Sequence, residues 1–173
     1  MVAESGSNPN SGKALSFYSH YRIGRRTRQA ERSSAPSIFL AEDNPADVEL
    51  LRMALEEHDI SCELFVTGDG EKAVSFIREI DSGVMACPRL AIIDLNLPKR
   101  SGREVLRYIR NCPVFDPVPV VILSSSGSPK DMAETAQLGA NKYIRKPSSL
   151  EEFLQIGGLL KLEIDASDSS HSY

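Results

Sequence analysis

Residues 90–98 read Leu-Ala-Ile-Ile-Asp-Leu-Asn-Leu-Pro, so a carboxylate, Asp94, directly follows a short apolar run. Four apolar residues before a turn-forming segment are typical of a buried strand that ends at the aspartate. Two further predicted strands end in charged residues in the same way, at Glu42-Asp43 and at Lys146. In a parallel sheet these ends lie side by side, at the edge where open α/β sheets place their sites.

Short apolar segments alternate with helical patterns from residue 36 onward. We expect strands over 37–41, 62–66, 90–94, 118–123 and 141–145, and helices over 45–58, 70–81, 101–111, 129–138 and 149–162. Five strand-helix units in strict alternation predict an α/β fold, a doubly wound parallel sheet with helices on both faces. The first helix should begin after Asn44 as its N-cap, with Pro45 in its first position.

The first 35 residues differ from the rest in charge and texture. They carry six basic and two acidic side chains, a net charge of +4, so residues 36–173 carry −8. They show no period that would bury a face, and we expect a flexible basic leader over 1–35, a folded domain over 36–162 and a polar tail over 163–173. A nucleic-acid-binding leader is the alternative, but its modest charge favours a solvated or partner-docking tail.

The cysteines and the hydropathy pattern favour a cytoplasmic protein. Cys62, Cys87 and Cys112 are odd in number and lack metal-ligand spacing, which predicts reduced thiols. No apolar run approaches the roughly 20 residues that span a membrane, and the N-terminus lacks the pattern of a secretory signal. We therefore expect no membrane partner.

The charged strand ends have the composition of a site for a divalent cation and a phosphoryl group. Close carboxylates such as Glu42, Asp43 and Asp94 either raise one another's pKa or recruit a cation. Mg²⁺ prefers such oxygen ligands, and the lack of imidazole in this region argues against zinc or copper. Lys146 supplies a positive charge for a phosphate oxygen, and Ser124, at a strand end, supplies a hydroxyl. Since a carboxylate can attack phosphorus, these residues predict a protein that accepts a phosphoryl group and holds it.

In the type, order and spacing of these residues, residues 36–162 resemble the response-regulator receiver domain of two-component signalling. The matching segments are Ala-Glu-Asp-Asn at 41–44, Asp-Leu-Asn-Leu-Pro at 94–98, Leu-Ser-Ser-Ser at 123–126 and Ile-Arg-Lys-Pro at 144–147. The resemblance implies a flavodoxin-like fold with five helices and the strand order 2-1-3-4-5 of the chemotaxis member of that family.

The resemblance also implies which residues hold the metal and the phosphoryl group. Asp94 would be phosphorylated. Mg²⁺ would be bound by Asp43, Asp94 and the backbone carbonyl of Asn96, while Glu42 would act through a metal-bound water. Lys146 would pair with a phosphoryl oxygen, and its bond to the following proline would be cis.

A second group of residues would respond to phosphorylation. By resemblance, Ser124 would bond a phosphoryl oxygen and Tyr143 would be the ring that changes rotamer. Asn96 and Ser126, each two residues past a site residue, would tune the rate of self-dephosphorylation. Ser124 and Glu42 depart from the family's commoner Thr and Asp, but each keeps the functional group.

These roles imply a stand-alone phosphoacceptor switch with slow self-dephosphorylation rather than an enzyme in the ordinary sense. The phosphoryl group would come from a sensor histidine kinase or a phosphotransfer protein. Output would pass through protein contacts, including homodimerisation, on the face formed by helix 129–138, strand 141–145 and helix 149–162. Within the family, the serine-rich loop and residues 43–47 look like those of small regulators paired with bacterial phytochromes. The alternative left open is a pseudo-receiver, a binding module that does not use phosphorylation.

Overall fold

The computed structural model describes residues 18–24 and 35–169. They form one six-stranded sheet in the order β1-β3-β2-β4-β5-β6. The strands are β1 (Ser19–Ile23), β2 (Ser37–Ala41), β3 (Cys62–Thr67), β4 (Leu90–Ile93), β5 (Val120–Ser124) and β6 (Lys142–Arg145). The helices are α1 (Pro45–Glu57), α2 (Gly70–Asp81), α3 (Gly102–Arg110), α4 (Pro129–Gln137) and α5 (Leu150–Ser169), with a 3₁₀ turn at Pro113–Phe115.

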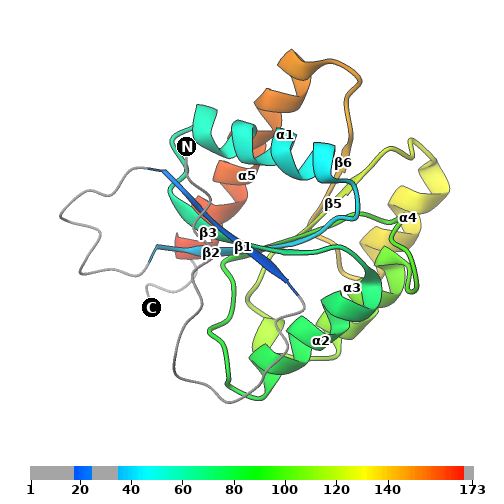
Figure 1. The fold of residues 1–173 in the computed structure, drawn as a ribbon. Coiled ribbons are helices and arrows are strands. Elements are labelled where there is room, and N and C mark those ends of the chain that lie inside the picture. The colour runs from blue at the N-terminus through cyan, green and yellow to red at the C-terminus, as the bar shows by residue number, and fades with distance from the viewer. Residues whose placement is uncertain (1–17, 25–34, 170–173) are drawn as a thin grey trace.

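The five strands predicted from the sequence pair in parallel and in the predicted order. Strands β2 to β6 form the series β3-β2-β4-β5-β6, which is 2-1-3-4-5 when the predicted strands are numbered by themselves. The helices α1 and α5 cover one face of this sheet, and α2 and α3 cover the other (Figure 1). The prediction of a doubly wound, flavodoxin-like α/β fold is confirmed.

Strand residues alternate between two hydrophobic cores. In β2, Ile38 and Leu40 pack with the residues of α1 and α5, whereas Phe39 and Ala41 pack with those of α2 and α3. Successive side chains of a strand point to opposite faces, so a strand covered on both faces is apolar at every position. This double burial explains why the central strands appear in the sequence as unbroken apolar runs.

Capping side chains fix where the helices near the sheet edge begin. The Asn44 side chain accepts a hydrogen bond from the Ala46 N–H at 3.0 Å, and Pro45 occupies the first turn of α1, as predicted. Ser101 and Glu104 form a complete capping box at the start of α3. Helix α1 thus starts two residues after Asp43, and α3 starts eight residues after Asp94.

The predicted flexible leader contains a strand. Ser19–Ile23 forms β1, which pairs antiparallel with β3 and becomes the edge strand of the sheet on that side. Ile23 is buried in the core, the His20 ring stacks on Phe65 with centroids 4.8 Å apart, and the Arg22 guanidinium donates to Glu63 at 3.0 Å. Five residues carry too weak a local pattern to predict a strand that forms by pairing with a distant edge. The remainder of the predicted leader, 1–17 and 25–34, lies outside the described residues.

The last helix is longer than predicted. We expected it to end near residue 162 and a polar tail to follow, but α5 runs to Ser169. Ile164 is only 7% exposed and extends the buried series Phe153, Ile156 and Leu160 by one more turn. Continued burial of one face offsets the polar composition of the residues after it. Residues 170–173 lie outside the described part of the chain.

The three cysteines all lie among the described residues. Cys62, Cys87 and Cys112 are free thiols, as predicted. Among the described helices, none combines the length and the apolar character needed to cross a bilayer.

Two adjacent glycines let α5 approach α1 closely. A Cβ placed on Gly157 would lie 2.1 Å from the Ala54 carbonyl oxygen and 2.6 Å from the His58 ring. The same contact is held by His58, whose Nε2 lies 3.1 Å from the Leu154 carbonyl oxygen, and by Lys161, whose ammonium donates to the His58 carbonyl at 3.1 Å. The glycines therefore interrupt no helix and serve helix–helix packing.

We predict that Gly157→Ala destabilises the protein. The higher helix propensity of alanine would favour the variant by up to about 1 kcal/mol, but the clash with α1 should outweigh it and cost about 1–3 kcal/mol. Denaturant unfolding would measure the change. Gly158→Ala is the matched control, because its nearest neighbour is a side-chain atom of His58 at 3.1 Å. A Gly157→Ala variant as stable as the Gly158→Ala variant would contradict this prediction.

Candidate functional site

The predicted site residues lie at the carboxyl edge of the parallel strands. Glu42 and Asp43 directly follow β2, Asp94 follows β4, Ser124 ends β5 and Lys146 follows β6. The parallel registers between β2 and β4, β4 and β5, and β5 and β6 bring these ends to one edge of the sheet. At that edge the Lys146 N–H donates to the Ser124 carbonyl oxygen at 2.8 Å.

The Lys146 ammonium joins three carboxylates. Its Nζ lies 2.6 Å from Asp94 Oδ2, 2.7 Å from Glu42 Oε2 and 2.8 Å from Asp47 Oδ2. The Lys146 side chain is only 9% exposed. Burial by itself would lower the pKa of this ammonium, but its hydrogen bonds to the carboxylates outweigh burial and raise the pKa above its ordinary value. Lys146 therefore carries its charge throughout the physiological pH range.

Asp47 is a site residue that the sequence analysis missed. It lies in the first turn of α1, where an acidic residue is common, so its type alone does not indicate a site. The cap at Asn44 starts α1 so that the Asp47 carboxylate reaches Lys146. Its position three residues after the predicted N-cap is the only sequence signal that it faces the strand ends.

Glu42 and Asp94 are buried carboxylates whose two oxygens are each engaged. Glu42 Oε1 accepts the Asn44 N–H at 3.0 Å, and Asp94 Oδ1 accepts the Asn96 N–H at 3.0 Å. Burial raises the pKa of the Glu42 carboxyl above its ordinary value, more than the hydrogen bonds from Lys146 and Asn44 lower it. The side chains of Asp43 and Asn96 are exposed.

The three carboxylates form a group able to hold a metal ion. One oxygen from each of Glu42, Asp43 and Asp94 lies within 4.8 Å of the others. The donors are all oxygen atoms, which suits a hard divalent cation such as Mg²⁺ or Mn²⁺. The exposed Asp43 leaves the group open to solvent on one side, so the residues fit a cation that keeps some of its water.

Backbone contacts fix the segment that follows Asp94. Asp94 N–H donates to the Ala41 carbonyl at 2.9 Å, and Gly102 N–H donates to the Leu95 carbonyl at 3.0 Å. A Cβ on Gly102 would lie 2.1 Å from the Asp94 carbonyl oxygen. Only glycine lets α3 start this close to Asp94, a requirement that the sequence analysis did not identify.

Ser124, Ser126 and Tyr143 are linked by hydrogen bonds. Ser124 is fully buried, and its Oγ accepts the Ser126 N–H at 3.3 Å. The Tyr143 hydroxyl donates to the Ser126 carbonyl oxygen at 2.8 Å. The structure thus connects the predicted switch ring to the loop after β5.

The predicted cis bond before Pro147 is wrong, because every peptide bond among the described residues is trans. The free-energy difference between the cis and trans isomers before proline is small enough for local packing to select either.

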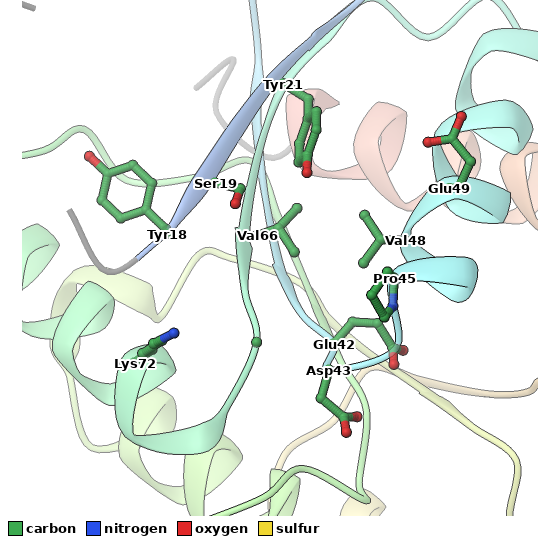
Figure 2. Close-up of a pocket in the computed structure, with 11 residues that line it drawn as sticks. Tyr18, Ser19, Tyr21, Glu42, Asp43, Pro45, Val48, Glu49, Val66 and Lys72 are labelled. Carbon is green, nitrogen blue, oxygen red and sulfur yellow. The ribbon is translucent and has the colours of Figure 1, made fainter. Parts of the chain in front are cut away.

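A groove of about 690 Å³ opens beside the acidic group. Figure 2 shows Glu42 and Asp43 at one end of this groove and the side chains of Tyr18 and Tyr21 at the other. Since Tyr21 lies on β1 and Tyr18 directly precedes it, the unpredicted strand shapes the surroundings of the site. The Arg52 guanidinium lies over the Tyr21 ring at 4.7 Å from its centroid and holds that wall in place.

Removal of the Lys146 charge should strengthen cation binding. In Lys146→Met, Glu42 and Asp94 would lose the ammonium that competes with a divalent cation for their oxygens. We predict that Mg²⁺ binds this variant at least about tenfold more tightly than the unchanged protein, a difference of about 1.4 kcal/mol. Isothermal calorimetry on metal-free protein would measure it. Lys142→Met is the matched control, because Lys142 lies on β6 but pairs with Glu163 at 3.1 Å. Equal affinities in the two variants would refute the prediction.

Comparison with known proteins shows the family to which the chain belongs. The family model described as the response regulator receiver domain matches residues 38–156. The chain is 34% identical over 131 residues to the response regulator Rcp1 of a Synechocystis species, covering 73% of this chain and 88% of Rcp1. The structure of the phosphorylated cyanobacterial phytochrome response regulator RcpA matches with a TM-score of 0.67 at 36% identity, covering 74% of this chain and 92% of RcpA. The Mn²⁺-bound form of Rcp1 matches with a TM-score of 0.66 at 32% identity, covering 73% and 91% of the two chains. The chain belongs to the family of response regulator receiver domains.

Proposed function

We propose that Asp94 accepts a phosphoryl group from the phosphohistidine of a sensor histidine kinase or phosphotransfer protein. The observation that carries the proposal is the 2.6 Å contact between Asp94 Oδ2 and Lys146 Nζ beside a group of carboxylates able to hold a cation. The similarity to Rcp1 and to the phytochrome regulator RcpA supports a sensor kinase of the phytochrome type as the donor. The free thiols support a reducing compartment, the cytoplasm, as the place of the reaction.

The reaction needs one nucleophile and neutralisation of phosphoryl charge. A carboxylate oxygen of Asp94 forms a bond to phosphorus, the bond from phosphorus to the donor's imidazole nitrogen breaks, and its electron pair stays on that nitrogen. Lys146, already at hydrogen-bond distance from Asp94, would offset the charge of a phosphoryl oxygen.

The carboxylates define where a cation would assist. Mg²⁺ would be held by Asp43, Asp94 and the Asn96 backbone carbonyl, with Glu42 acting through a water, and would neutralise further phosphoryl charge. The buried Glu42 already shares one oxygen with Lys146, which is consistent with an indirect role.

Phosphorylation would shift the loop after β5 between two populated conformations. A phosphoryl oxygen that accepts the Ser124 hydroxyl would draw the loop after β5 inward, and Tyr143, bonded to that loop, would move with it. The face of α4, β6 and α5 would then prefer a different protein partner or a second copy of the chain. Exposed Met132 on α4 and exposed Leu159 and Leu162 on α5 supply apolar contact area for it. Asn96 and Ser126 would set a slow rate of self-dephosphorylation.

Phosphorylation by a small acyl phosphate tests the proposal. With acetyl phosphate and Mg²⁺, intact-mass spectrometry should show one added phosphoryl group on the unchanged protein and none on Asp94→Asn. Asp43→Asn keeps the nucleophile but removes a proposed metal ligand, so it should label at least about tenfold more slowly at limiting Mg²⁺.

Asp116→Asn controls for loss of an aspartate that lies outside the site residues, and it should label normally. If acetyl phosphate together with Mg²⁺ does not label the unchanged protein, the chain is a pseudo-receiver that binds partners without phosphorylation. Labelling of Asp94→Asn at the normal rate would overturn the assignment of Asp94.

A further inference from the structure

Ser126 uses all of its polar groups in the loop after β5. Its N–H donates to Ser124 Oγ at 3.3 Å and its carbonyl oxygen accepts the Tyr143 hydroxyl at 2.8 Å. Its hydroxyl donates to Asp131 Oδ2 and accepts the Ser128 N–H at 3.2 Å. One residue therefore contacts both proposed switch residues through its backbone and α4 through its side chain.

Asp131 is held in turn from a different element. The Arg103 guanidinium, on α3, donates through Nη2 to Asp131 Oδ1 and through Nε to Glu134 Oε2 at 3.0 Å. The Arg103 and Asp131 side chains are 27% and 20% exposed, so water screens their attraction only in part. Asp131 also stands in the first turn of α4, where a negative charge is favourable. Its two carboxylate oxygens thus bridge Arg103 and Ser126.

We propose that Arg103 and Asp131 are positioning residues that hold Ser126 so that Ser124 and Tyr143 respond together. The Asp131 carboxylate fixes the Ser126 hydroxyl, and this orients the two peptide groups on either side of the Ser126 Cα. Because those groups bond Ser124 and Tyr143, a displacement of Ser126 changes both contacts at once. The consequence for signalling rests on the proposed phosphorylation of Asp94, but the positioning itself exists without it.

The simplest rival explanation is an ion pair that merely joins α3 to α4. Glu134 separates the two explanations, because it binds the same arginine from the same helix, whereas the Ser126 hydroxyl donates to Asp131. A variant that removes Glu134 weakens the α3–α4 connection and an ion pair with Lys130 within α4, but it leaves the bond between Asp131 and Ser126 intact. A variant that removes Asp131 weakens it and also releases Ser126.

The first experiment uses the full chain without phosphorylation. NMR would follow the exchange of the Ser126 amide hydrogen and the ring signals of Tyr143. The Ser126 amide is bonded to Ser124 and the Tyr143 hydroxyl to the Ser126 carbonyl, so neither group is bonded to Asp131 itself. In Asp131→Ala, the Ser126 amide should exchange at least about tenfold faster, because a hydrogen bond to a charged group is lost, and the Tyr143 signals should shift. In Glu134→Ala, both should stay within about twofold of the unchanged protein. If the two variants behave alike, the rival explanation holds.

A second pair of variants guards against general damage to α4. Ser126→Ala leaves Asp131 and Arg103 intact but removes the hydroxyl, and it should reproduce the Tyr143 shift. Ser126→Thr keeps a hydroxyl and should restore the original Tyr143 signals. If Ser126→Ala leaves Tyr143 unchanged, the positioning role is wrong even if Asp131→Ala unfolds.

The second experiment measures decay of the acyl phosphate. Release of Ser126 should weaken the hydrogen bond from the Ser124 hydroxyl to the phosphoryl group. The Asp131→Ala variant should therefore dephosphorylate at least about threefold faster than the Glu134→Ala variant. The double variant with Ser126→Ala should decay no faster than the quicker single variant, because both changes break one connection. If the two single substitutions increase the dephosphorylation rate independently, so that their effects multiply in the double variant, the proposal is contradicted. If Asp94 is never labelled, the proposed function fails, while the amide exchange still decides the positioning role.

Discussion

The hydrogen bonds from the Lys146 ammonium to Asp94, Glu42 and Asp47 are the interaction on which the rest of the site depends. Three carboxylates so close together would repel one another, and two of them are largely withdrawn from water. The ammonium offsets this repulsion and joins α1 to the ends of β2, β4 and β6. The parallel registers of the strands bring these charges together, because the carboxyl ends of β2, β4 and β6 lie at one edge of the sheet.

The strand ends were predictable, because the signal is local and the geometry is general. An apolar run that stops at Asp94, and similar runs that stop at Glu42 and Lys146, need only a parallel sheet to bring them together. What the sequence did not reveal depends on contacts between distant residues. Strand β1 exists because His20 and Arg22 meet β3, and Asp47 joins the site because α1 is oriented by its cap. The packing role of Gly157 has no local signal either, since its neighbour across the helix interface, Ala54, is about a hundred residues away in the chain.

The site at the sheet edge is joined to the face of α4, β6 and α5 by a short series of hydrogen bonds rather than by a rigid element. Ser124 is buried at the end of β5, Ser126 bonds it in the following loop, and Tyr143 on β6 bonds Ser126. A loop held by a few hydrogen bonds can adopt a second arrangement at modest cost, which a buried strand cannot. This difference explains how a chemical change at the sheet edge could alter α4 and β6 while the sheet itself stays fixed.

Locating the modified residue tests the central claim, phosphorylation of Asp94, most directly. Borohydride reduces an aspartyl acyl phosphate to homoserine, which peptide mass spectrometry identifies at its position in the chain. After treatment with acetyl phosphate and Mg²⁺, we predict homoserine at position 94 and aspartate at positions 43, 47 and 131. Homoserine at another position with aspartate retained at 94 would contradict the claim.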